Sequence, residues 1–120
     1  MNELVRVQGS RRGGVSLVLV EGEVDLSNAQ QVGAMIRSLA GNEATSLVVD
    51  LTHTTYLDSA GIALLITLAE RLRARRRQFR LVVPPTSPVH RVLQLTGLPD
   101  LLVVHAGVDE ALADQDAAPP

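Results

Sequence analysis

The chain has no cysteine and no lysine, and its only aromatic residues are one tyrosine and one phenylalanine. Without cysteine, the protein can form neither disulfides nor thiolate metal sites. All eleven basic residues are arginine, and thirteen acidic residues leave a formal net charge of −2. Nucleic-acid binding usually needs a basic domain with aromatic stacking platforms, so this composition argues against nucleic acid and against an anionic membrane as direct partners.

Long apolar runs are also missing. The longest run, at residues 61–66, is far short of the roughly 20 residues that cross a bilayer. The N-terminus lacks the basic head and apolar stretch of a secretory signal. We therefore expect a cytoplasmic protein without a membrane segment. With 120 residues, 46% of them hydrophobic, the chain has the length of one domain with a sizeable core.

Apolar patterning alternates between strands and helices along the chain. Strands are expected at residues 4–7, 15–25, 46–51, 78–83 and 101–104, and helices at 28–40, 59–76, 88–97 and 109–113. The first two strands should form an antiparallel hairpin around the glycines of residues 9–14. Later strands are separated by helices, which requires parallel pairing through right-handed crossovers.

The fold class that follows is α/β, in a single domain over residues 1–113. We expect a mostly parallel sheet of about four or five strands with an antiparallel N-terminal strand, and three or four helices. Residues 114–120 are predicted to be a flexible C-terminal tail.

Polar residues mark where the helices begin and end. Ser27 and Gln30 have the spacing of a capping box, and Gly41 is expected to end the first helix. Ser87 followed by Pro88 predicts an N-cap and a first helical position. Gly97 is expected as the C-cap of the third helix.

The start of the helix at 59–76 has the clearest local chemistry. Asp58 is predicted to be the N-cap, with its carboxylate accepting from the amides of Ala60 or Gly61. Ser59 would then open the helix, near unpaired amides and the positive end of the helix dipole.

One face of this helix is expected to be buried and the other to face solvent. At about 100° per residue, the apolar side chains fall on one arc: Ile62, Leu65, Ile66, Leu68, Ala69 and Leu72. Outside this arc lie Ser59, Ala60, Ala63, Thr67 and Glu70. Ser59 therefore begins a strip of small, mostly uncharged residues that a partner could approach closely.

The serine does not fit a hydrolase. A nucleophile elbow needs G-x-S-x-G, and Leu57 replaces its first glycine. His53 is near in sequence, but nothing positions it as a base, and we interpret it as a loop or surface residue. Asp50 is interpreted as a polar group at a strand end. No phosphate-binding loop or metal spacing is present, so we expect no enzyme, cofactor or metal.

Arginines cluster between residues 71 and 80. Positive charge in the last turns of a helix complements the helix dipole. We favour this solvated helix end over a nucleic-acid site.

Residues 48–51, the following loop, and residues 57–62 before a leucine-rich helix resemble the signature of the STAS domain. The resemblance is specifically to bacterial anti-sigma-factor antagonists. Residues 21–25, followed by Ser27 and a helix, are similar to a second landmark of the family. The resemblance covers residues 4–113 and includes the order of elements.

This resemblance implies a non-catalytic switch. The unphosphorylated protein would bind an anti-sigma factor that is also a serine kinase, thereby releasing a sigma factor. The kinase would use ATP to phosphorylate the serine of D-S-x-G, here Ser59, and a phosphatase of the PP2C type would reverse this. The expected partner-binding residues are Asp25, Asn28, Asp58, Ser59, Ala60, Gly61, Ala63 and Thr67.

An alternative stays open from the sequence. Some STAS domains are accessory subunits of lipid-transport ABC systems or parts of stress-signalling assemblies, and they dock through the same surface. The intact serine and the lack of a membrane segment favour the antagonist.

Overall fold

Six strands and four helices lie within residues 4–41, 46–95 and 102–114, which this computed structural model describes. In chain order they are β1 (Val5–Arg12), β2 (Val15–Val24), α1 (Ala29–Ala40), β3 (Ser46–Asp50), β4 (Thr54–Leu57), α2 (Ser59–Ala74), β5 (Gln78–Val82), α3 (Pro88–Leu95), β6 (Val103–His105) and α4 (Val108–Asp114).

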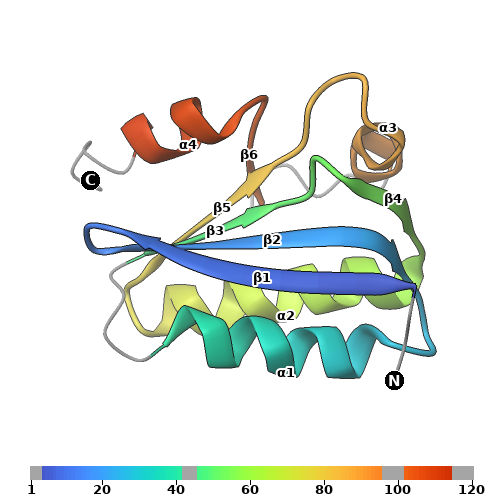
Figure 1. Cartoon of the computed structure of the whole chain (residues 1–120), viewed down its shortest axis with the longest axis horizontal. Helices are drawn as coiled ribbons and strands as arrows, with labels where there is room; N and C mark the ends of the chain where they lie inside the picture. Colours follow the sequence, from blue (N-terminus) through green and yellow to red (C-terminus); the bar gives the residue numbers. More distant parts are fainter. Residues whose placement is uncertain (1–3, 42–45, 96–101, 115–120) are drawn as a thin grey trace.

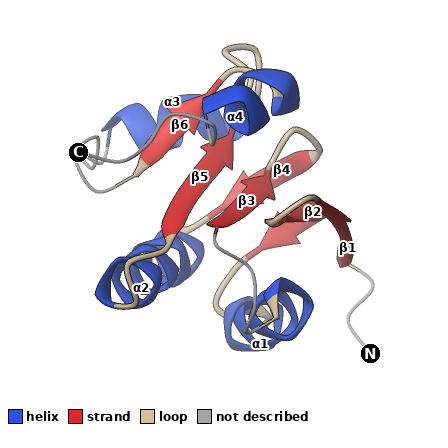
Figure 2. Ribbon diagram, turned by 90° about the vertical axis from the view of Figure 1, so that its left-hand side faces the viewer, coloured by secondary structure: helices blue, strands red, loops and turns tan. Residues whose placement is uncertain are grey.

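The strands form one mixed sheet in the order β1-β2-β3-β5-β6, with β4 paired to β2. Only β1 and β2 pair antiparallel among the described strands, and the other pairs are parallel. Helices α1 and α2 cover one face of the sheet, and α3 and α4 lie on the opposite side (Figures 1 and 2). The predicted α/β class and its antiparallel first strand are confirmed.

Apolar side chains fill the space on both sides of the central strand β3. Val49 belongs to the larger core cluster, which includes residues of α1 and α2, whereas Val48 packs with Ala111 of α4. Both valines are fully buried. The nearly continuous apolar run of this strand therefore reflects helices on both faces of the sheet.

The N-terminal hairpin is longer than predicted. β1 runs to Arg12 and pairs with β2 down to Val15, so the turn contains only Gly13 and Gly14. Gly13 has a φ of +62°. Glycine adopts this left-handed region at little steric cost, which suits a two-residue hairpin turn.

The strand β4 was not predicted, because residues 52–56 were expected to be a loop. It pairs parallel with the last residues of β2, and the register shifts between Gly22 and Glu23. Gly22 has a φ of +104°, and a Cβ there would overlap the carbonyl oxygen of Leu4. A glycine at this bulge thus lets β2 pair first with β3 and then with β4.

The predicted capping box at Ser27 is wrong. The first helix begins at Ala29, its N-cap is Asn28, and no side chain caps it. Ser27 instead donates its hydroxyl hydrogen to Asp25 Oδ1, at 2.5 Å. Because the helix begins one residue later than predicted, Ser27 lies in the turn before the N-cap, where its side chain bonds locally to Asp25.

The other helix ends agree closely with the prediction. Gly41, with a φ of +73°, is the C-cap of α1, and the amide of Val89 donates to Ser87 Oγ at 3.2 Å. The predicted C-cap at Gly97 lies outside the described residues. So does all of the predicted tail except Asp114, which closes α4.

Candidate functional site

The parallel strands β2 and β4 end at the same edge of the sheet, where Val24 is paired with Leu57. The turn at residues 25–28 follows β2, and Asp58 with α2 follows β4. The backbone amide of Asp58 donates to the carbonyl of Val24 at 3.3 Å. Two segments more than thirty residues apart in sequence are thereby joined where α1 and α2 begin.

Asp58 is the N-cap of α2, as predicted. Its Oδ1 accepts from the amides of Ala60 at 2.9 Å and Gly61 at 3.1 Å. Its backbone is extended, with φ −96° and ψ −170°, as N-cap residues usually are. The second carboxylate oxygen, Oδ2, accepts from the amide of Leu26 at 3.1 Å. The sequence did not predict this link to the turn after β2.

Ser59 is the first residue of α2, and its side chain is exposed. Within the described part of the chain its hydroxyl has no hydrogen-bond partner. The amides of Ala60 and Gly61 are already bonded to Asp58. The expectation that the hydroxyl would lie near unpaired amides is therefore wrong for these two groups, and the serine side chain is left to solvent.

Gly61 is buried and lets the first turn of α2 pack closely on the ends of β2 and β4. A Cβ at this position would overlap Cδ1 of Leu57 and lie 3.2 Å from the carbonyl oxygen of Val24. The glycine of D-S-x-G therefore has a packing reason in this fold. The lack of a side chain at Gly61 allows the helix start that carries Ser59 to lie directly on these strand ends.

The predicted strip on α2 is largely exposed: Ser59, Ala63, Thr67 and Glu70 face solvent. Ala60 differs, because it is half-buried and packs against the core. Most of the predicted apolar arc faces the core: Leu65, Leu68 and Ala69 are buried, and Ile62 and Leu72 pack beside them.

The turn after β2 is held by two polar side chains. Asp25 Oδ1 accepts from the amide of Ser27 at 2.9 Å. Asn28 Oδ1 accepts from the amide of Asp25 at 3.0 Å, and its Nδ2 donates to the carbonyl of Glu23 at 2.9 Å. Asn28 is only 1% exposed. It shapes the turn from inside, whereas Asp25 is half-buried at the surface.

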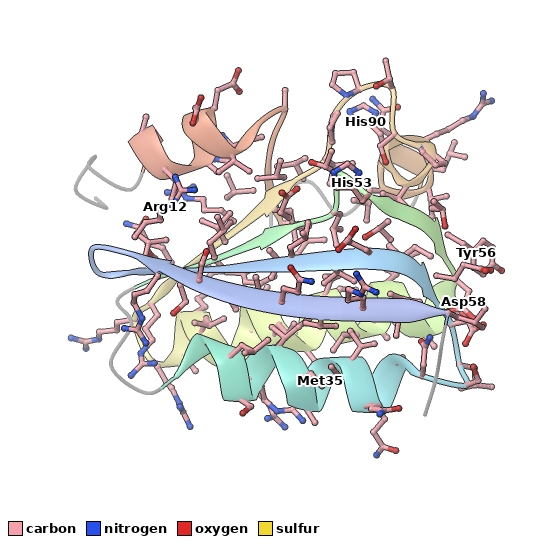
Figure 3. The ribbon with its side chains drawn as sticks, in the orientation of Figure 1. Arg12, Met35, His53, Tyr56, Asp58 and His90 are labelled. Atoms are coloured by element: carbon pink, nitrogen blue, oxygen red, sulfur yellow. The ribbon has the colours of Figure 1, made fainter. Side chains whose placement is uncertain are left out.

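Two apolar residues at this edge were missed by the sequence analysis. Leu26 is 82% exposed, and Tyr56, two residues before Asp58, is 49% exposed. In Figure 3 the labelled Tyr56 and Asp58 lie at the same end of the molecule. The sequence could have indicated the exposure of Leu26, because it lies between two polar residues of a turn, away from the apolar pattern of a strand or helix.

Two of the three histidines of the chain lie away from this edge. His53 is exposed in the β3–β4 connection, and Figure 3 places both His53 and His90 well away from Asp58. Asp50 Oδ1 accepts from the amide of Thr52 at 3.0 Å and from its hydroxyl at 2.5 Å. Asp50 is thus a polar group at a strand end, as interpreted from the sequence.

Comparison with known protein families matches residues 6–111 to the STAS domain. The chain belongs to the STAS domain family. This STAS domain is 31% identical over 88 residues to an anti-sigma-B factor antagonist of Listeria monocytogenes, a match that covers 72% of this chain and 75% of the relative. It is 27% identical over 108 residues to an anti-sigma-F factor antagonist of Mycobacterium tuberculosis, covering 90% and 87% of the two chains.

A solved structure agrees with this assignment. The crystal structure of an anti-sigma factor antagonist from Mycobacterium paratuberculosis is similar to this STAS domain with a TM-score of 0.85 and 26% identity. The similarity covers 94% of this chain and 95% of the other. Within the described residues of the STAS domain, no helix is long and apolar enough to span a membrane.

Proposed function

We propose that this protein is a cytoplasmic anti-sigma-factor antagonist controlled by phosphorylation of Ser59. The observation that carries the proposal is an exposed hydroxyl at the first residue of α2, with no partner in the described structure, beside the exposed Leu26. The names of the two relatives that are similar over most of this chain support the antagonist function.

The binding surface is formed by the exposed side chains around Ser59. Ala63 and Thr67 continue from Ser59 along the solvent side of α2. Their small size allows a partner to approach the helix closely. Leu26 projects from the neighbouring turn, and fully burying a leucine contributes about 1.5–3 kcal/mol. An anti-sigma factor would thus meet a shallow strip with one apolar anchor at its edge.

Phosphorylation would change the charge of this surface without changing the fold. A phosphoryl group adds about −1.5 to −2 charges, next to the carboxylate of Asp58. The amides of Ala60, Gly61 and Leu26 are already occupied by that carboxylate. The phosphate would therefore gain mainly the helix dipole, about 0.3–1 kcal/mol, and stay in solvent.

The consequence for binding is electrostatic and steric. A phosphate on Ser59 places bulk and charge in the centre of the contact surface. A charge left unmatched in an interface costs several kcal/mol. The phosphorylated antagonist would dissociate from its partner, and the anti-sigma factor would again hold the sigma factor.

The chemistry is carried out on this protein by other proteins. The anti-sigma factor would act as the serine kinase, with ATP as phosphoryl donor, and a phosphatase of the PP2C type would remove the phosphate. The placement of His53 and His90 away from Asp58 supports a role as substrate and binder instead of catalyst.

The test is incubation of the purified protein with its candidate kinase and ATP, followed by intact-mass and peptide mass spectrometry. We expect the mass of one phosphate, located on Ser59, and none on the Ser59→Ala variant. Ser38→Ala, which removes an exposed serine of α1, is the matched control and should be phosphorylated normally. Equal phosphorylation of the Ser59→Ala variant would contradict the proposal.

A further inference from the structure

Arginine side chains from two helices converge on a hollow at the end of the molecule opposite Ser59. The hollow, of about 230 Å³, lies where α1 and α2 end. Its charged lining consists of Arg37 from α1, Arg71 from α2, Arg75 at the end of α2, and Arg77 just before β5. In Figure 3, nitrogen-bearing side chains gather around the ends of these two helices, on the side away from Asp58.

A fifth guanidinium lies at the edge of this hollow. Gly41 lines the hollow, and a Cβ on it would lie 2.9 Å from Nη2 of Arg11. The φ of +73° at Gly41 and its lack of a side chain leave room for this approach. Strand β1 thus brings a cation to the same place as the two helices.

The positive charge exceeds what the helix ends require. Each helix C-terminus carries about −0.5 of an elementary charge, or about −1 for α1 and α2 together. Four guanidinium groups line the hollow, and no carboxylate is found among its described lining residues. Arg77 already makes an interaction of its own, which leaves Arg37, Arg71 and Arg75. Among the described lining residues, these three positive charges exceed the charge of about −1 at the two helix ends. The solvated-helix-end interpretation accounts for only part of it.

The floor of the hollow is apolar. Leu47 of β3 and Leu68 of α2 line it and are almost fully buried, and the half-buried Leu72 adjoins them. Guanidinium groups donate two parallel hydrogen bonds to phosphate or carboxylate oxygens. A cationic rim above an apolar floor is suited to a small molecule with an anionic head and an apolar body.

We propose that this hollow binds a small, multiply charged oxyanion, an organophosphate or polycarboxylate metabolite. Its volume is below the roughly 300–1,000 Å³ of pockets for drug-sized ligands, which fits a metabolite and not a polymer. Arg37, Arg71 and Arg75 hold the anionic groups, and the leucines contact the remainder of the ligand.

The site goes beyond the proposed function because it is separate from the surface around Ser59. Ser59 begins α2, and Arg71 and Arg75 lie at its other end. At 1.5 Å per residue, the sixteen residues of this helix span about 24 Å. A ligand in the hollow would leave the surface of Ser59 and Leu26 uncovered.

The test uses the full chain without any protein partner. Pyrophosphate and citrate are titrated separately at about 150 mM salt, where exposed charges are screened over about 8 Å. Calorimetry and ¹⁵N NMR follow the binding. We expect one saturable site with a dissociation constant of ~1 mM or tighter and amide shifts around Gly41 and Leu72. Stronger binding of pyrophosphate assigns a phosphate ligand, and stronger binding of citrate a carboxylate ligand.

Variants separate this site from general charge attraction. Arg71→Gln and Arg75→Gln should each weaken binding about tenfold, the effect of losing one charge-assisted contact. Arg91→Gln removes the same charge from an exposed position on α3 and should bind as the unmodified protein does. Circular dichroism checks that each variant is folded.

Three results would overturn the proposal. These are no saturable binding of either anion, equal weakening by Arg71→Gln and Arg91→Gln, or binding only to a short DNA duplex or to anionic vesicles. Because neither kinase nor anti-sigma factor is present, failure here would leave the proposed function of Ser59 untouched.

Discussion

The carboxylate of Asp58 accepts a hydrogen bond from the backbone amide of Leu26, with 3.1 Å between Oδ2 and N. The same carboxylate caps α2 through its other oxygen. One side chain therefore fixes both the start of the helix that carries Ser59 and the turn that exposes Leu26. Asp58 therefore fixes the position of the Leu26 turn relative to the start of α2.

Replacing Asp58 should loosen both parts together. Asp58→Ala is expected to lower the free energy of unfolding by about 1 kcal/mol through loss of the cap. It should also raise the hydrogen-exchange rate of the Leu26 amide. Asp58→Asn keeps an oxygen for the cap and should retain most of the stability. Urea unfolding and amide exchange measure these effects, and an unchanged Leu26 exchange rate in Asp58→Ala would contradict the coupling.

Substitutions at Ser59 should distinguish partner binding from the regulation of that binding by phosphorylation. Ser59→Ala is expected to bind the anti-sigma factor and to resist release by kinase and ATP. Ser59→Asp should bind at least about tenfold more weakly. An unmatched charge in the interface costs more than the ~1.4 kcal/mol that corresponds to a tenfold change in affinity. Calorimetry with the purified partner measures both. Equal affinity of the two variants would remove the switch from the mechanism.

Leu26 should contribute to binding without contributing to stability. Leu26→Ser is expected to weaken partner binding by about tenfold or more, from the loss of ~1.5–3 kcal/mol of burial. The change in unfolding free energy should stay within about 0.5 kcal/mol, as is usual for surface positions. Leu95→Ser is the matched control, since Leu95 is 76% exposed on α3. The same loss of affinity in both variants would count against a specific role of Leu26.

A methyl group at Gly61 should disturb the base of the site. Gly61→Ala is expected to destabilise the fold by about 1–3 kcal/mol, as overpacking does, because the new Cβ overlaps Leu57. Gly107→Ala is the control, since no heavy atom outside its neighbours lies within 4 Å of a Cβ there. Thermal unfolding compares the two. Relief of the Gly61→Ala effect by Leu57→Ala would identify the clash as its cause.

Local signals in the sequence predicted the elements whose formation depends on neighbouring residues. The cap at Asp58 and the start of α3 at Ser87 and Pro88 follow from such signals, and the structure confirms them. The fold class followed from alternating apolar patterns. These features can be predicted without knowing which strands pair.

Features that depend on distant contacts were missed. β4 has only four residues, and it forms because the bulge at Gly22 turns the end of β2 toward it. The capping box is absent because the helix begins at Ala29 with Asn28 as its N-cap, one residue later than the box requires. The link from Leu26 to Asp58 spans 32 positions in the chain. The residues that form these contacts show no periodic pattern in the sequence, so sequence patterns could not predict the contacts.

The occupied amides of Ala60 and Gly61 have a consequence for how long a phosphate on Ser59 would persist. Because Asp58 already uses these donors, the two amides would not hold the phosphate and shield it from a phosphatase. The phosphorylated and free forms would then differ little in intrinsic folding energy. On the proposed function, the lifetime of each state would be set by the relative activities of kinase and phosphatase, and the fraction of phosphorylated Ser59 would report the balance between these two enzymes.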